Sequence, residues 1–357
     1  MPTGSNFRIV AVDINPATRT VVTGTELFTR EVCSRLPATE PGIRWRFFAS
    51  QPKAGLGVDV VVLPFRRMWS QVRLPAALAA ERPDLLFVPG HVIPFAWPGK
   101  VLTVIHDLAF ELFPDAYPLS DRTYLQLTTR WALARSRLLI TVSESTKRDL
   151  VERHDVAPDR VRVVPLGIGQ PSVTPAPVSR LSELGLNGHF VLQVGRVETR
   201  KNQAAALAAV ERLDDLTLAV AGPEHDRALG GRLRGSRRCR VLGAVDQATL
   251  ELLYQRAEAV VVPSLYEGFG LPVLEAMVRG KVVVAAKTSS LPEVGGEAAL
   301  YCHDPGDPAD LANVLQMALS DETLRTELAQ AGRARAARFT WDRTAAEVTA
   351  VIKEALA

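Results

Sequence analysis

Two carboxylates accompany a glycine-rich turn in the stretch SLYEGFGLPVLEAM, residues 264–277. The run AVVVPS that leads into it has the composition of a buried strand, and Pro272 suits the first turn of a helix, where its missing N–H is not needed. The amides of residues 269–271 would then carry the positive end of the helix dipole. Gly268 and Gly270 would let a ligand approach the backbone closely. Residue types and spacing therefore predict a phosphate site.

The carboxylates are Glu267, within the turn, and Glu275, about one turn inside the helix. Phosphate would be repelled by both, but hydroxyls on either side of a phosphate can donate hydrogen bonds to them. A nucleotide-sugar has this order of groups: sugar, diphosphate, ribose. The plainer alternatives are that Glu267 stabilises the helix start and that Glu275 is a solvated helix residue. The residues beside Glu275 in the sequence are apolar, which favours a partner for its carboxylate.

The elements that position this turn alternate between strands and helices. Short apolar runs are separated by amphipathic stretches, which predicts parallel sheets covered by helices on both faces. The runs are RIVAVDI (8–14), VDVVVL (58–63), DLLFV (84–88), VLTVIHD (101–107), RLLITVS (137–143) and RVRVVPLG (160–167), then FVLQVG (190–195), LTLAVAG (216–222), RVLG (240–243), AEAVVVPS (257–264) and KVVVAA (281–286).

A segment rich in Pro, Gly and Ser, GIGQPSVTPAPVSRLSELGLNG, separates the two series of runs and is typical of a linker. We therefore expect an α/β protein of two doubly wound, Rossmann-like domains, residues 1–170 and 171–338. A terminal helix, 339–357, is expected to pack back toward the first domain. Ligands of such sheets bind at the carboxyl ends of the strands, so two facing domains would enclose a cleft.

Four blocks of the sequence, taken together, resemble the retaining glycosyltransferases of family 4, which have the GT-B fold. EGFGLPVLEA is similar to that family's E-x7-E signature, and VLQVGRVETRKNQ (191–203) to its strand followed by Gly-Arg-x4-Lys-Asn. VIHDLAFELFPDAYP (104–118), with the segments that follow it, and FTWDRTAAEV near the end also match, in the family's order. The resemblance covers essentially the whole chain, and four ordered blocks are more specific than one glycine motif.

The resemblance implies roles for residues of the second domain. Arg196 and Lys201 would bind the donor diphosphate, whose charge grows as the glycosidic bond breaks. Glu267 would bind hydroxyls of the donor sugar, and Glu275 the ribose. The remaining residues expected to contact the donor are Gly195, Gly268, Phe269, Gly270 and Leu271.

In the first domain, His106 matches the family histidine near the donor sugar, and Asp107 follows it at the end of a strand. The loop VVTGTEL (21–27) corresponds to the family's glycine loop under the diphosphate, with Gly24 and Thr25 as the expected contacts. Family members usually carry two glycines there, and this chain has Gly24 alone. His91 is a weaker candidate near the acceptor. No cluster of His and acidic residues completes a metal site, and the family needs no metal, so neither a metal nor a cofactor is expected.

The function expected from the resemblance is transfer of a hexose from a nucleotide diphosphate sugar to a hydroxyl of a glycan, lipid-linked or small-molecule acceptor, with retention of the anomeric configuration. GDP-mannose is the first choice of donor and a UDP-hexose the second. Two alternatives stay open: a GT-B nucleotide-sugar epimerase, and a catalytically inactive nucleotide-sugar-binding partner protein.

Composition and charge indicate which partners and which cellular location to expect. The 357 residues are 47% hydrophobic and 23% charged, as in soluble globular proteins, and the net charge of +3 gives no field that would recruit nucleic acid. Three scattered cysteines and the absence of a signal-peptide pattern predict a cytoplasmic protein. The segment PFRRMWSQVRLP (64–75) is typical either of a peripheral contact with the inner face of a membrane or of a helix docked on the core with solvated arginines. Oligomeric state is not readable from the sequence.

Overall fold

The computed structural model describes residues 7–19, 23–65 and 68–357. They form two units, the first comprising residues up to Gly167 together with Thr340–Ala357, and the second Ile168–Phe339. The sequence placed the boundaries after residues 170 and 338. Each unit is built on one parallel sheet, so the predicted α/β class with two Rossmann-like domains is confirmed.

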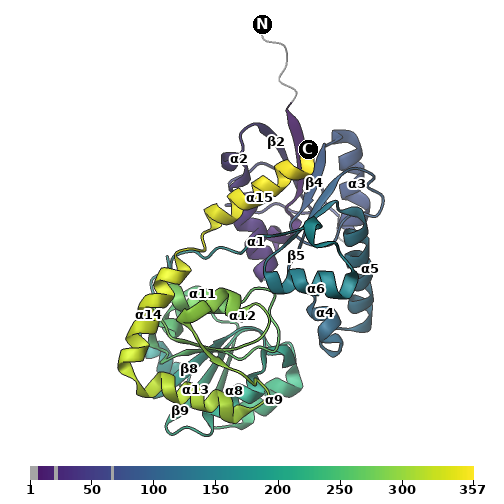
Figure 1. Cartoon of the computed structure of the whole chain (residues 1–357). Coiled ribbons are helices and arrows are strands. Elements are labelled where there is room, and N and C mark those ends of the chain that lie inside the picture. Colours follow the sequence, from purple (N-terminus) through teal and green to yellow (C-terminus); the bar gives the residue numbers. More distant parts are fainter. Residues whose placement is uncertain (1–6, 20–22, 66–67) are drawn as a thin grey trace. The chain divides into compact units, whose positions relative to one another are not determined.

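The first unit contains a seven-stranded sheet in the order β3-β2-β1-β4-β5-β6-β7, and every neighbouring pair is parallel (Figure 1). The order reverses between β1 and β4, which is where open α/β sheets bind ligands. The central strands β4 and β5 are buried on both faces. The strands are β1 (Arg8–Asp13), β2 (Ile43–Ala49), β3 (Val60–Val62), β4 (Leu85–Val88), β5 (Val101–Ile105), β6 (Leu138–Thr141) and β7 (Val161–Val163).

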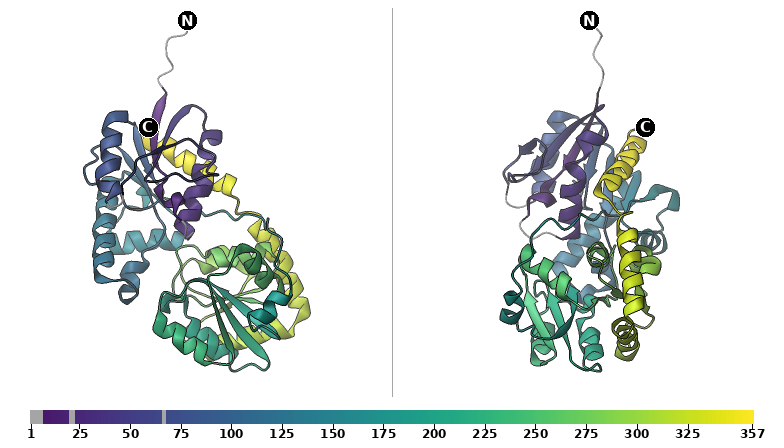
Figure 2. Two further views of the ribbon diagram at one scale, coloured as in Figure 1. Left: turned by 180° about the vertical axis from the view of Figure 1, so that it is seen from behind. Right: turned by 90° about the vertical axis from the view of Figure 1, so that its left-hand side faces the viewer.

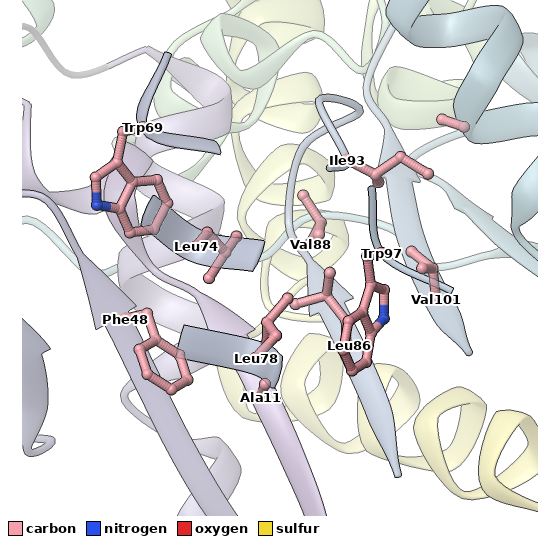
Figure 3. Close-up of a cluster of buried hydrophobic side chains, with 11 residues drawn as sticks. Ala11, Phe48, Trp69, Leu74, Leu78, Leu86, Val88, Ile93, Trp97 and Val101 are labelled. Carbon is pink, nitrogen blue, oxygen red and sulfur yellow. The ribbon is translucent and has the colours of Figure 1, made fainter. Parts of the chain in front are cut away.

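Helices cover both faces of this sheet. On one face α3 and α5 pack over β1, β2, β4 and β5 through a cluster that includes Trp69, Leu74, Leu78 and Trp97 (Figure 3). On the other face α15 packs against α1, α2 and the central strands. The helices of the unit are α1 (Gly24–Cys33), α2 (Leu36–Thr39), α3 (Trp69–Glu81), α4 (Ala109–Leu112), α5 (Leu119–Arg135), α6 (Glu144–His154) and α15 (Trp341–Leu356).

The second unit contains a six-stranded parallel sheet in the order β10-β9-β8-β11-β12-β13, which reverses between β8 and β11. Its strands are β8 (His189–Val194), β9 (Leu216–Ala221), β10 (Cys239–Gly243), β11 (Val260–Val262), β12 (Val283–Ala286) and β13 (Leu300–Cys302). Its helices are α7 (Ser179–Glu183), α8 (Gln203–Val210), α9 (Arg227–Gly235), α10 (Gln247–Arg256), α11 (Leu271–Val278), α12 (Leu291–Gly295), α13 (Pro308–Ser320) and α14 (Glu322–Ala336).

The last helix, α15, completes the first unit rather than the second (Figure 2). Thr340 caps its start by accepting a hydrogen bond from the Arg343 amide. Its apolar face is buried in the first unit, with Val348 and Ile352 among the buried side chains. At its edge the guanidinium of Arg35, which directly precedes α2, donates to Asp342 at 2.7 Å. The two passages of the chain between the units lie side by side, since the Ile168 amide donates to the Phe339 carbonyl.

Candidate functional site

The point of reversal in the second sheet holds most of the residues singled out in the sequence. β8 ends at Val194, and the chain then forms a loop, residues 195–202, before α8. Gly195 and Gly222 have φ values of +143° and +155°, which side-chain-bearing residues rarely adopt. A Cβ on Gly222 would lie 2.1 Å from the Gly195 carbonyl oxygen. The glycines thus let the end of β9 pass directly beside this loop.

Lys201 and Glu267 form an ion pair that joins this loop to the turn after β11. The Lys201 Nζ atom lies 2.5 Å from Glu267 Oε1. The Ser264 hydroxyl donates to the same oxygen at 2.7 Å. Burial of Glu267 raises the pKa of its carboxyl, but the charges of Lys201 and Arg200 more than offset this and hold the pKa at about 2. Glu267 is therefore ionised over the whole physiological range.

Arg200 is a buried member of the same cluster that the sequence did not single out. Its Nη1 donates to the Tyr266 carbonyl at 2.8 Å and to Glu267 Oε2 at 3.3 Å, and its Nη2 donates to Glu198 at 2.6 Å. The Leu265 amide donates to the Arg200 carbonyl, which adds a backbone link. Arg200 therefore fastens the loop to the turn. One signal in the sequence could have identified Arg200: it stands two residues after Glu198, with which it pairs, and directly before Lys201.

Arg196 differs from its two cationic neighbours in the loop. Its guanidinium makes no hydrogen bond or ion pair with any residue in the described part of the chain. Its backbone is held instead, because the buried Gln203 amide donates to the Arg196 carbonyl at 2.8 Å. Gln193 does the same for the Lys201 carbonyl at 2.7 Å. The structure thus supplies one cation without a counter-charge, on a backbone fixed by two buried amides.

The turn after β11 enters α11 at Leu271, one residue before Pro272, as the sequence predicted. Gly270 has φ +102°, and a Cβ there would meet Leu291 at 2.8 Å. The Ser290 hydroxyl donates to the carbonyls of both Glu267 and Phe269, and the Glu267 amide donates to Ser289. Two serines from the loop after β12 therefore fix the conformation of the glycine turn.

Glu275 has the partner that its apolar neighbours suggested. The Tyr254 hydroxyl, from α10, donates to Glu275 Oε2 at 2.7 Å. The Arg279 guanidinium lies 4.5 Å from the centre of the Tyr254 ring and pairs with Glu251 at 2.7 Å. Tyr254, which the sequence analysis missed, thus orients the Glu275 carboxylate, whose Oε1 accepts no hydrogen bond from any described residue.

In the first unit, His106 follows the end of β5. Its Nε2 lies 2.8 Å from the Pro89 carbonyl oxygen, so that nitrogen carries the proton and donates. The Phe28 ring from α1 meets the imidazole edge to face at 5.2 Å. Burial lowers the pKa of His106, so the ring is neutral at physiological pH. Asp107 accepts a hydrogen bond from the Ala109 amide and so fixes the start of α4.

The N-terminus of α1 lies beside the loop after β4, whose Pro89 carbonyl accepts the hydrogen bond from His106. Gly24 is the first residue of α1, and a Cβ on Gly90 would lie 3.9 Å from the Thr25 methyl group. Thr23 and Glu26 form a capping box at this end. Val21 and Val22, which belong to the same expected phosphate loop, lie outside the described residues.

His91 lies in the same group of loops. Its ring stacks on Phe110 at 6.1 Å. Burial lowers the pKa of His91 to about 4, and its Nε2 has no hydrogen-bond partner among the described residues. Three segments of the first unit therefore carry these residues: the start of α1 has Gly24 and Thr25, the loop after β4 has His91, and the loop after β5 has His106. No group of three or more His, Cys, Asp or Glu residues suited to a metal ion occurs in the described chain.

Comparisons with known proteins bear on the family and the fold of the chain. Residues 22–169 match the family described as "Glycosyltransferase Family 4", and residues 182–335 match "Glycosyl transferases group 1". The chain is 31% identical to O-antigen chain mannosyltransferase B of Escherichia coli over 258 residues, 68% of this chain and 67% of that protein. It is 30% identical to the D-inositol 3-phosphate glycosyltransferase of Salinispora arenicola over 373 residues, 93% of this chain and 83% of that protein. The fold is similar to that of HepE from Anabaena, crystallised with UDP and glucose, with a TM-score of 0.75, 19% identity and coverage of 98% and 100%.

Proposed function

The chain belongs to family 4 of the glycosyltransferases, and from this membership we propose that it transfers a hexose from a nucleotide diphosphate sugar to a hydroxyl acceptor, with retention and without a metal. The observation that carries the proposal is the Glu267 carboxylate held by Arg200 and Lys201, in a loop that also carries Arg196, which is unpaired among the described residues. Buried charges arranged in this way at the reversal point of a sheet are typical of ligand sites.

The charges of the cluster leave a net positive contribution for a diphosphate. Glu198 and Glu267 balance Arg200 and Lys201, so Arg196 supplies the surplus charge. The Lys201 ammonium has three donors and gives one to Glu267, which leaves two for phosphate oxygens. We therefore assign the diphosphate to Arg196 and Lys201. As the glycosidic bond breaks, both cations stabilise the charge that develops on the leaving phosphate.

The two carboxylates are proposed to bind the sugars on either side of that diphosphate. Glu267 Oε1 already accepts from Lys201 and Ser264, whereas Oε2 accepts one longer bond, from Arg200, within the described part of the chain. Oε2 therefore retains capacity for a hydroxyl of the donor sugar. Glu275 Oε1 has the same capacity for a ribose hydroxyl, since Tyr254 occupies only Oε2.

For the chemical step we propose displacement on one face of the sugar, in which the leaving phosphate accepts the proton of the incoming hydroxyl. His106, neutral and held by the Pro89 carbonyl, would act in transfer as a hydrogen-bonding group rather than as a cation. Asp107 would hold the backbone around it. Gly24, Thr25 and His91 would contribute contacts from the first unit. In this scheme the protein aligns the reactants and stabilises charge.

GDP-mannose remains the first choice of donor, supported by the similarity to a mannosyltransferase. A UDP-hexose is the second, supported by the complex of HepE with UDP and glucose. The acceptor is proposed to be a glycan or a lipid-linked hydroxyl at the cytoplasmic face of a membrane. In the described part of the chain, the helices are all too short or too polar to cross a bilayer.

A panel of nucleotide-sugars tests the donor directly. A bound donor raises the melting temperature by mass action, so GDP-mannose, UDP-glucose, GDP and UDP are compared with and without EDTA. Transfer is then followed with radiolabelled donor and a membrane lipid extract, and the product anomer is determined by NMR. Retention without a metal predicts the donor's own anomeric configuration and full activity in EDTA.

Variants of the charged loop separate this proposal from its alternatives. Arg196→Ala and Lys201→Ala are expected to lower transfer by about 10²–10³-fold or more. Arg232→Ala, an exposed cation of α9, is the matched control and should leave transfer unchanged. Near-normal transfer in both loop variants would overturn the assignment. Conversion of the donor sugar without an acceptor would identify an epimerase, and tight binding without transfer would identify a binding protein.

A further inference from the structure

The outward face of α5 carries several large apolar side chains that are exposed. The helix buries Thr128, Thr129, Ala132 and Leu133 against the sheet. At 100° per residue the opposite side carries Leu119, Ser120, Thr123, Tyr124, Leu127, Arg130, Trp131 and Ala134, and it contains no carboxylate. Leu119 is 68% exposed and Leu127 56%. A surface helix normally presents charged residues on this side.

The apolar surface continues from α5 onto α3. The Phe95 ring, 46% exposed, packs against Trp131 at 5.7 Å. Phe95 is tied to α3 because its amide donates to the Gln71 side chain at 2.9 Å. On α3 the next residue, Val72, is also exposed, as is Met68 one turn earlier. Figure 1 shows α3 and α5 along the same side of the sheet. We call Met68, Val72, Phe95, Tyr124 and Leu127 the α3–α5 surface.

The exposed charges at this surface are cationic. Arg73 on α3 and Arg130 on α5 are exposed, and neither pairs with any residue in the described ranges. The one carboxylate of α5, Asp121, is exposed in the first turn, where the Ser120 hydroxyl donates to it at 3.2 Å, and it is not among the eight residues of the outward side. Of the residues in the segment 64–75, Trp69 is buried in the core and donates to the Leu63 carbonyl, while Arg66 and Arg67 lie outside the described residues. The contact surface is therefore not centred on Trp69.

We propose that the α3–α5 surface binds the interface of an anionic lipid bilayer. Apolar side chains flanked by unpaired arginines match the acyl boundary and the negative headgroups of such a membrane. A second copy of the chain fits less well, because a two-fold contact would bring Arg73 and Arg130 toward their own like charges. The role of this membrane contact rests on the proposed function, because the contact would hold the enzyme near a lipid-linked acceptor.

Vesicle sedimentation tests the proposal on the full chain without donor or acceptor. Vesicles of phosphatidylcholine alone are compared with vesicles that also contain phosphatidylglycerol. We expect binding only to the anionic vesicles, weakening as salt is raised. Leu127→Asp and Arg130→Glu are each expected to lower the partition coefficient by about tenfold. Met317→Asp on α13 and Arg232→Glu on α9 are matched controls, since both residues are exposed in the second unit.

Each outcome of these measurements supports or overturns the proposal. Loss of vesicle binding in Leu127→Asp and Arg130→Glu but not in the controls, with melting temperature and nucleotide-sugar binding unchanged, supports it. Equal binding by all four variants overturns it. So does a dimer in light scattering that Leu127→Asp converts to monomer without altering vesicle binding. Because nucleotide-sugar binding is measured separately, failure of the donor assignment is distinguishable from failure of the membrane contact.

Discussion

Replacement of Arg200 by methionine tests whether the buried charge cluster holds the second unit together. Met has a similar length and an apolar surface, so the change removes the charge while largely keeping the volume. It leaves Glu198 without its 2.6 Å ion pair and leaves Glu267 with Lys201 alone. Breaking a buried pair by removing one partner typically destabilises by about 3–5 kcal/mol, because the remaining charge is uncompensated.

The pKa of Glu267 gives a separate measure of the same interaction. Its fall from 4.5 to about 2 corresponds to roughly 3 kcal/mol of preference for the ionised form, which is what remains after Lys201, Arg200 and Ser264 offset the penalty of burial. We therefore take about 3 kcal/mol, the lower end of the range for breaking a buried pair, as the expected loss for Arg200→Met. For a unit of this size that lowers the melting temperature by roughly 6–12 °C.

Differential scanning calorimetry of the full chain measures this change. The double variant Glu198→Gln with Arg200→Met should melt above Arg200→Met, because the carboxylate that lost its ion pair is then replaced by a neutral amide. Arg196→Met is the internal comparison: its guanidinium has no partner among the described residues, so the melting temperature should not fall although transfer does. A melting temperature for Arg200→Met within about 2 °C of the parent, or no recovery in the double variant, would refute the reasoning.

Three further changes test other parts of the structure. Burial of Asp13 raises the pKa of its carboxyl from 3.8 to about 7, so its ionisation destabilises the fold as pH rises between these values. Asp13→Asn should therefore increase the free energy of unfolding by about 4 kcal/mol near pH 8 and by less than half of that near pH 5. Equal gains in urea unfolding at the two pH values would contradict this. Tyr254→Phe removes the donor to Glu275 and should weaken nucleotide binding about 3–10-fold in calorimetric titration, with Tyr301→Phe as the control. Gly222→Ala places a Cβ against the Gly195 carbonyl and should destabilise by about 3 kcal/mol in urea unfolding, whereas Gly231→Ala, which meets nothing within 4 Å, should not.

The sequence predicted those features of the fold that depend on local pattern. β8 and α11 lie where apolar runs and the Gly-Pro signals placed them, because glycine and proline restrict the backbone whatever surrounds them. β2 was not among the apolar runs because Arg44 and Arg46 interrupt it, although its other residues reach the core. Edge and near-edge strands bury less of each face, so their apolar pattern is weaker.

The sequence also indicated which residues belong to the candidate site, but not how they pair. Lys201, Glu267 and Glu275 could be selected by type and spacing. Arg200 is buried against the carboxylate of Glu267, which lies 67 positions further along the chain. No local sequence pattern encodes a contact between such distant residues. Tyr254 comes from another helix for the same reason. The assigned roles remain predictions for the variants above to test.

The return of α15 to the first unit affects the order in which the chain can fold during synthesis. The strands and most helices of the first unit precede the second unit in the sequence, but the apolar face that covers their sheet, including Trp341 and Ile352, is translated after the second unit. The second unit is one continuous segment and has all its parts before α15 leaves the ribosome. We therefore expect the half that is translated later to reach its native state first, while the earlier half waits with an uncovered sheet face that a chaperone can recognise.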